Sequence, residues 1–137
     1  MTEQVDHPKH YAHPSGVECI DLAEVMNFNL GNALKYLWRA GFKDSQPLAT
    51  DLAKAAWYIR RHCEQIPSQS AFTGAEVASM RLPTREELVK KWYLVESHSD
   101  EMTLLGAFMR AVRDARGAQL RGNLSVVLGM IDKELGR

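Results

Sequence analysis

The spacing of apolar and polar positions predicts an amphipathic helix over residues 30–40. Its apolar face consists of Leu30, Ala33, Leu34, Leu37, Trp38 and Ala40. Its polar face consists of Asn32, Lys35, Tyr36 and Arg39. Gly41 follows, and glycine commonly ends helices, so we expect the helix to stop there.

A second helix is predicted from near Pro47 or Thr50 to Cys63 or Gln65, because Pro67 cannot continue it. Its apolar side is predicted to hold Ala49, Leu52, Ala53, Ala56, Trp57, Ile59 and Cys63, and Arg60 is the one charged residue on that side. Its polar side is predicted to hold Asp51, Lys54, Tyr58, Arg61 and His62. Helices joined by a short loop pack antiparallel, so we expect the two polar stripes to face a common cleft.

Capping patterns predict helices in the rest of the chain. They predict Ser15 with Glu18 opening a helix over 17–26, Thr84 with Glu87 opening one that ends near Ser97, and Ser99 opening one over 100–115. A last helix is expected over 118–135. No segment alternates convincingly with period two, so we predict an all-α fold: a compact helical bundle with an irregular N-terminal arm and a C-terminal helical extension.

Composition divides the chain further. Residues 1–66 are expected to form the motif-bearing core with its arm, and residues 67–83, rich in Ser, Gly, Ala and Pro, a linker or mobile loop. Residues 84–137 are expected either to pack on the core or to form an oligomer interface. With 137 residues, one main domain with an appended piece is the expected size.

The charge balance and the absence of evident targeting signals restrict the classes of function that we expect. The chain has 17 basic and 17 acidic residues, so it does not predict stable nucleic-acid binding by bulk electrostatics. No signal peptide or membrane span is evident, which favours a cytoplasmic protein without a membrane partner. Cys19 and Cys63 fall on apolar helix faces and are expected to be reduced, buried thiols; a disulfide between them is not indicated.

Tyrosines lying among cations on both polar stripes suggest a flat, anionic ligand, and a nucleotide fits that description. A structural alternative remains open, in which the cations pair with acids of neighbouring helices. These acids are Glu18, Asp21, Glu24 and Asp51. Three histidines of the arm, His7, His10 and His13, are poorly spaced for a metal. Two other interpretations stay open: His10 and Tyr11 fold over the helices and help to close a site, or the arm is loosely ordered.

Four segments carry a resemblance to a known family, and they span about residues 7–63. They are His10-Tyr11, Gly16-Val17-Glu18-Cys19-Ile20-Asp21, the run from Gly31 to Asp44, and the run from Asp51 to Tyr58. In order and spacing, the chain resembles a small bacteriophage family that includes a coliphage nucleotide kinase and many members of unknown function. The resemblance implies phosphoryl transfer from ATP or another nucleoside triphosphate to a deoxynucleoside monophosphate, in the host cell cytoplasm. It implies a protein without the usual phosphate-binding loop, and no G-x-x-x-x-G-K-[ST] run is present.

Under this hypothesis the cations and their neighbours have specific roles. We expect Lys35 and Arg39 to bind phosphates, with Asp51 orienting a cation or accepting a proton. Nucleotide contacts are further predicted for His10, Tyr11, Asn32, Tyr36, Lys43, Lys54, Tyr58 and Arg61. Glu18 and Asp21, three residues apart, resemble half of a carboxylate pair for Mg²⁺.

Two alternatives stay open beside the kinase. A protein that sequesters a nucleotide without turnover, for example against a host defence, needs the same cations. A metal-dependent nucleotide pyrophosphatase is disfavoured, because Asn32, Lys35 and Arg39 stand where a second acidic pair is needed. Nucleotides are the expected partners, and we expect a homo-oligomer.

Overall fold

The computed structural model describes residues 13–40, 47–65, 85–99, 103–113 and 117–137. Its regular elements within these ranges are helices, which confirms the all-α prediction. They are α2 (Cys19–Ala23), α3 (Phe28–Arg39), α4 (Leu48–Gln65), α6 (Arg85–Ser97), α7 (Leu104–Val112) and α8 (Gly117–Glu134). None of the described helices is both long and apolar enough to cross a membrane.

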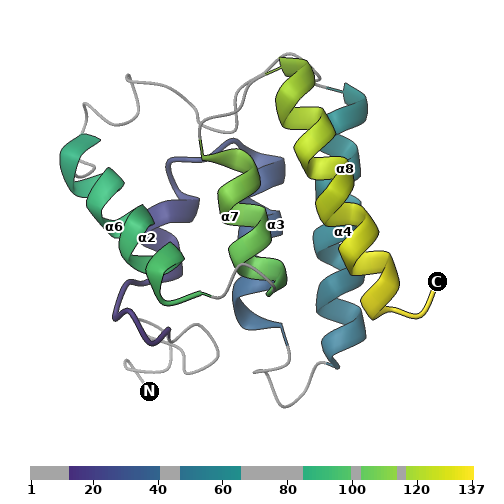
Figure 1. Cartoon of the computed structure of the whole chain (residues 1–137), viewed down its shortest axis with the longest axis horizontal. Coiled ribbons are helices and arrows are strands. Elements are labelled where there is room, and N and C mark those ends of the chain that lie inside the picture. Colours follow the sequence, from purple (N-terminus) through teal and green to yellow (C-terminus); the bar gives the residue numbers. More distant parts are fainter. Residues whose placement is uncertain (1–12, 41–46, 66–84, 100–102, 114–116) are drawn as a thin grey trace.

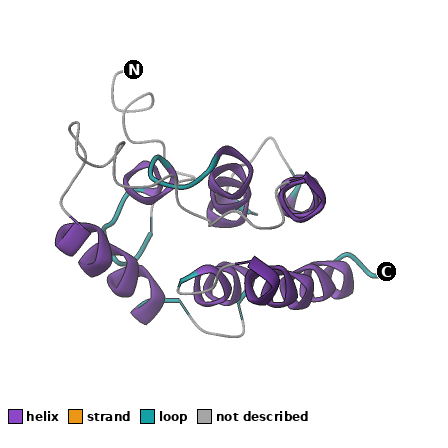
Figure 2. Cartoon of the chain, turned by 90° about the horizontal axis from the view of Figure 1, so that it is seen from above, coloured by secondary structure: helices purple, strands orange, loops and turns teal. Residues whose placement is uncertain are grey.

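The helices form two layers, which Figure 2 shows edge-on. One layer contains α2, α3 and α4, and the other contains α6, α7 and α8. Across the layers α2 packs on α6, α3 on α7 and α4 on α8 (Figure 1). The C-terminal helices therefore cover one face of α3 and α4.

The core lies between the layers. Leu34 from α3, Phe108 from α7 and Leu124 from α8 have no exposed surface, and they belong to one hydrophobic cluster. The apolar face predicted for α3 is buried except at Ala40, which is partly exposed. Burying a side chain of this size contributes roughly 1.5–3 kcal/mol, so interlayer packing is the main source of helix stability.

Helix α3 begins at a strong cap. The Oδ1 of Asn27 accepts a hydrogen bond from the backbone N–H of Leu30 at 3.0 Å, and its amide lies 3.4 Å from Nδ1 of His62 on α4. One turn later, Gly31 lets α3 approach α2: a Cβ on this glycine would lie 2.9 Å from the carbonyl oxygen of Ala23. Asn27 and Gly31 together fix where α3 starts and how closely it packs on α2.

His13 ties the segment before α2 to both layers. Its ring lies 5.1 Å from that of Trp38, and its Nε2 lies 3.1 Å from the hydroxyl of Ser99. Its Nδ1 accepts the backbone N–H of Ser15, so the neutral ring donates from Nε2. Burial, and to a smaller extent the charge of His98, lowers the pKa of His13.

Two helix starts differ from the prediction. Helix α2 is only Cys19–Ala23, and its N-cap is Glu18; the Ser15 hydroxyl instead accepts the backbone N–H of Val17. Helix α7 starts later than the predicted residue 100, because Thr103 and not Ser99 is its N-cap. The Oγ1 of Thr103 accepts a hydrogen bond from the N–H of Gly106, whereas the hydroxyl of Ser99 bonds to His13. Both serines stabilise turns rather than helices, an alternative open to small hydroxyl residues.

The predicted division of α4 into a buried and an exposed side was partly wrong. Asp51 and His62, predicted on the polar side, are buried, whereas Ala49, Ala53 and Trp57, predicted on the apolar side, are exposed. The buried arc runs instead through Leu52, Ala55, Ala56 and Ile59. The two buried polar side chains are accommodated because each meets a polar partner on α3 or at its cap.

The other helix predictions are confirmed at most ends. Helix α4 ends at Gln65, α6 ends at Ser97 with Trp92 and Val95 buried, and α8 covers most of the range predicted for the last helix. Buried apolar residues of α8 are Leu120, Leu124, Val127 and Ile131. The stop at Gly41, the cap at Thr84 and the linker over 67–83 lie outside the described residues, so the division of the chain there stays a prediction.

Candidate functional site

Two tyrosines meet where α3 and α4 pack side by side. The rings of Tyr36 and Tyr58 are stacked, with centroids 6.0 Å apart and planes inclined by 12°. Both are partly buried against the core, which fixes their positions. The antiparallel hairpin thus places one predicted tyrosine from each helix on a shared surface.

Three cations surround the ring of Tyr36. From its centroid, Lys35 Nζ lies 4.7 Å away, Arg39 Cζ 4.9 Å and Lys54 Nζ 5.4 Å. We call these five side chains, Lys35, Tyr36, Arg39, Lys54 and Tyr58, the tyrosine–cation surface. Each cation gains about 0.5–1 kcal/mol from an exposed ring, but the three also repel one another, so an anion that binds here relieves that repulsion.

Arg39 is held from the buried side. Its Nε donates to Oδ1 of Asp51 at 3.2 Å, and the side chains are 9% and 0% exposed. Asp51 lies in the first turn of α4, where the helix dipole also favours a carboxylate. The pair holds the guanidinium against the ring of Tyr36, and the functional role expected for Asp51 stays a prediction.

Lys35 and Lys54 differ from Arg39 in their partners. Among the described residues, no carboxylate lies within 4.0 Å of the ammonium group of either lysine. Elsewhere cations do pair across helices, as Lys91 does with Asp21 at 3.2 Å. The structural alternative therefore describes Arg39 and leaves the two lysines unexplained.

Sequence reasoning missed two aromatic residues of this region. Phe28, expected in a connection, is 75% exposed, and its ring lies 6.1 Å from Tyr58. Trp57, expected in the core, is 54% exposed, lies 5.0 Å from Tyr58 and carries Arg61 at 5.5 Å from its ring centroid. Arg61 thus joins Trp57 rather than Tyr36. The signal available in the sequence was a tryptophan directly beside a predicted site tyrosine.

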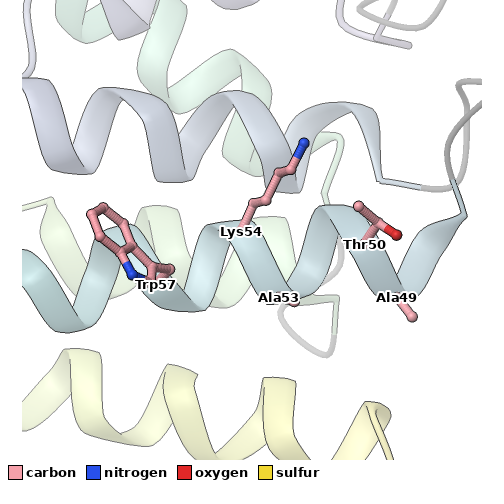
Figure 3. Close-up of a pocket in the computed structure, with 5 residues that line it drawn as sticks. All are labelled: Ala49, Thr50, Ala53, Lys54 and Trp57. Atoms are coloured by element: carbon pink, nitrogen blue, oxygen red, sulfur yellow. The ribbon is translucent and has the colours of Figure 1, made fainter.

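A shallow hollow of about 450 Å³ lies along α4. It is lined by Ala49, Thr50, Ala53, Lys54 and Trp57, which Figure 3 shows on successive turns of α4. Lys54 extends from this hollow towards the neighbouring helix, consistent with its contact to Tyr36. The hollow therefore adjoins the tyrosine–cation surface through one shared lysine.

The remaining predicted residues are placed differently. The Asn32 amide donates to the carbonyl of Phe28 at 2.9 Å, on the stretch of α3 between Phe28 and Tyr36. Asp21 is paired with Lys91, and within the described ranges no three acidic, His or Cys side chains come together as metal ligands. His7, His10, Tyr11 and Lys43 lie outside the described residues.

Neither cysteine takes part in this surface. Both are free; burial raises the pKa of the Cys19 thiol to about 12 and also raises that of Cys63. A thiol with so high a pKa is a poor nucleophile. Cys19 is buried as predicted, whereas Cys63 is only partly buried.

Comparison with known proteins adds one finding. Residues 5–60 match a family described as a protein of unknown function (DUF3310). The matched region contains α2, α3 and most of α4, and hence the whole tyrosine–cation surface. The curated proteins contain no match, and neither do the solved structures. The chain is thus similar to this family in the part that carries the candidate site.

Proposed function

We propose that the tyrosine–cation surface binds nucleotides and that the protein transfers a phosphoryl group from a nucleoside triphosphate to a deoxynucleoside monophosphate. The observation that carries the proposal is the gathering of Lys35, Arg39 and Lys54 around Tyr36, with no carboxylate near either lysine in the described part of the chain. Stacked tyrosines suit a base, and clustered cations suit its phosphates.

The roles follow from position. A base stacks on the tyrosine pair, and Lys35 and Lys54 neutralise phosphate oxygens as point charges. Arg39, fixed by Asp51, offers a planar group for two oxygens. Asp51 is fully buried, so we assign it to positioning Arg39 and not to contact with substrate.

The reaction needs little proton transfer. An oxygen of the acceptor monophosphate attacks the γ-phosphorus, the bond from that phosphorus to the β,γ-bridging oxygen breaks, and two nucleoside diphosphates result. With a second phosphate pKa near ~6, the acceptor is mostly a dianion at neutral pH and needs no general base. Positioning and charge neutralisation are the contributions that these cations make. Mg²⁺ enters the proposal with the phosphates of the triphosphate.

One observation favours a second function, sequestration of a nucleotide without turnover. Trp57 and Phe28 are exposed beside the tyrosine pair, so the described surface is open. Phosphoryl transfer benefits from water exclusion, whereas binding alone does not need it.

A single experiment separates these functions. The pure protein is incubated with ATP and each deoxynucleoside monophosphate, with Mg²⁺ or with a chelator, and the products are separated. A diphosphate formed from one monophosphate supports the kinase, and its loss in Lys35→Met and Lys54→Met supports the site. Lys90→Met is the matched control, because Lys90 is an exposed lysine on α6.

The other outcomes are equally informative. Binding without any diphosphate would support sequestration. Release of monophosphate and pyrophosphate from a triphosphate would identify a hydrolase. Full activity in both lysine variants would refute the proposed site.

A further inference from the structure

Aromatic and cationic side chains continue beyond the tyrosine–cation surface along α4. Past Tyr58 the next ring is Trp57, at 5.0 Å and nearly perpendicular (84°), with Arg61 above it. Tyr58 therefore contacts both Tyr36, by stacking, and Trp57, edge to face. Each of these two positions combines an aromatic ring with at least one cation.

The hollow on α4 includes Trp57 and shares Lys54 with the tyrosine–cation surface. Its lining combines two alanines, Ala49 and Ala53, with the larger side chains of Trp57 and Lys54. Lys54 also reaches Tyr36 at 5.4 Å, so one ammonium group serves both sides. The hollow is shallow and open, and its lining is aromatic and small apolar apart from Thr50 and Lys54.

We infer that this surface binds a ligand with two nucleobases, a dinucleotide, one base at Tyr36 and the other in the hollow against Trp57, with a phosphate at Lys54. The inference rests on the proposed nucleotide binding and extends it to a second base. Stacking on exposed aromatic rings beside cations is how proteins bind successive bases of single-stranded nucleic acid. Because all the cations involved are local, the absence of net charge on the chain does not oppose a ligand this short.

The chain carries its own probe for this test. Its tryptophans are Trp38, Trp57 and Trp92, and only Trp57 is exposed, since the other two are 2% and 4% exposed. A base that stacks on Trp57 is expected to quench its emission. Calorimetric titrations and fluorescence are measured with the four 5′-phosphorylated deoxydinucleotides of a single base and with the matching monophosphates.

For at least one base, we expect the dinucleotide to bind roughly tenfold more tightly than the monophosphate and to quench Trp57, the scale of one added base–aromatic stack. Trp57→Ala is expected to remove the advantage of the dinucleotide and leave monophosphate affinity unchanged. Ala53→Leu, which fills the hollow and keeps every aromatic ring, is expected to do the same. Ala118→Leu, at an exposed alanine of α8, is the matched control and is expected to bind like the unmodified protein.

Several results would overturn the inference. Equal affinity for dinucleotide and monophosphate would leave the proposed function intact and remove the second base. An unchanged advantage in Ala53→Leu would place the second base elsewhere. A lower molar mass of Trp57→Ala by light scattering would assign the hollow to a second copy of the chain. Failure of both ligands to bind would overturn the inference and the proposed function together.

Discussion

Removal of the Asp51 carboxylate tests how the site is held. In Asp51→Ala, Arg39 keeps its charge in a place where only 9% of its side chain is exposed. At 3.2 Å and an effective dielectric constant of about 20, the lost attraction is about 5 kcal/mol before desolvation is considered. Breaking a buried pair from one side typically costs 3–5 kcal/mol, so we expect the free energy of unfolding to fall by about 4 kcal/mol.

Urea denaturation followed by circular dichroism measures this loss directly. The matched control is Asp132→Ala, which removes a carboxylate from partly exposed pairs with Arg60 and Arg137 and should cost less than about 1 kcal/mol. The double variant Arg39→Met with Asp51→Leu should recover most of the stability lost in Asp51→Ala, because no charge then stays buried alone. A loss below about 1 kcal/mol in Asp51→Ala would refute the reasoning.

Three further predictions concern stability and reactivity. Gly31→Ala should lower the free energy of unfolding by at least about 1 kcal/mol, because the new Cβ would lie 2.9 Å from the backbone oxygen of Ala23. Gly129→Ala on α8 has open space around it and should raise the free energy of unfolding by ~0.5–1 kcal/mol. Urea titrations in which both variants change stability in the same direction would contradict this. Burial lowers the pKa of His13 and of His62, so the unfolded chain binds more protons than the folded one, and stability should be lost as the pH falls below the usual histidine pKa of 6.5. In thermal melts at about pH 7.5 and 5.5, His13→Asn should show a smaller loss of stability at the lower pH than the unmodified protein. Cys19, with its pKa near 12, should resist a thiol reagent at about pH 8 in the native protein and react once the protein is unfolded. Peptide mass mapping identifies the labelled cysteine, and rapid labelling of Cys19 in the native protein would contradict its burial.

Much of α3 and its part of the site could be predicted from sequence because the information is local. The apolar arc around Leu34 is continuous, and three leucines and Trp38 lie on it, so the buried face is unambiguous. Lys35 and Tyr36 then follow on the partly exposed side, whereas Arg39, predicted beside them, is buried against Asp51. The antiparallel connection to α4 placed Lys54 and Tyr58 beside them, as the ring distances show.

The orientation of α4 could not be predicted in the same way. Alanines carry little information about burial, and Asp51 and His62 looked polar because their partners are distant in sequence: Arg39 for Asp51 and Asn27 for His62. A helical wheel shows which residues share a face, but not which face another helix covers. Trp57 was therefore assigned to the core, although α3 and α8 cover other sides of the helix.

The most direct test of the central claim is calorimetric titration of the protein and of Lys54→Met with nucleoside monophosphates. The proposed site predicts that at least one monophosphate binds and that Lys54→Met weakens it by roughly tenfold, the loss of about 1.4 kcal/mol expected from a charge-assisted contact. Lys90→Met should bind like the unmodified protein. Equal affinity in Lys54→Met and the unmodified protein, or no binding of any monophosphate, would contradict the claim that this surface is a nucleotide site.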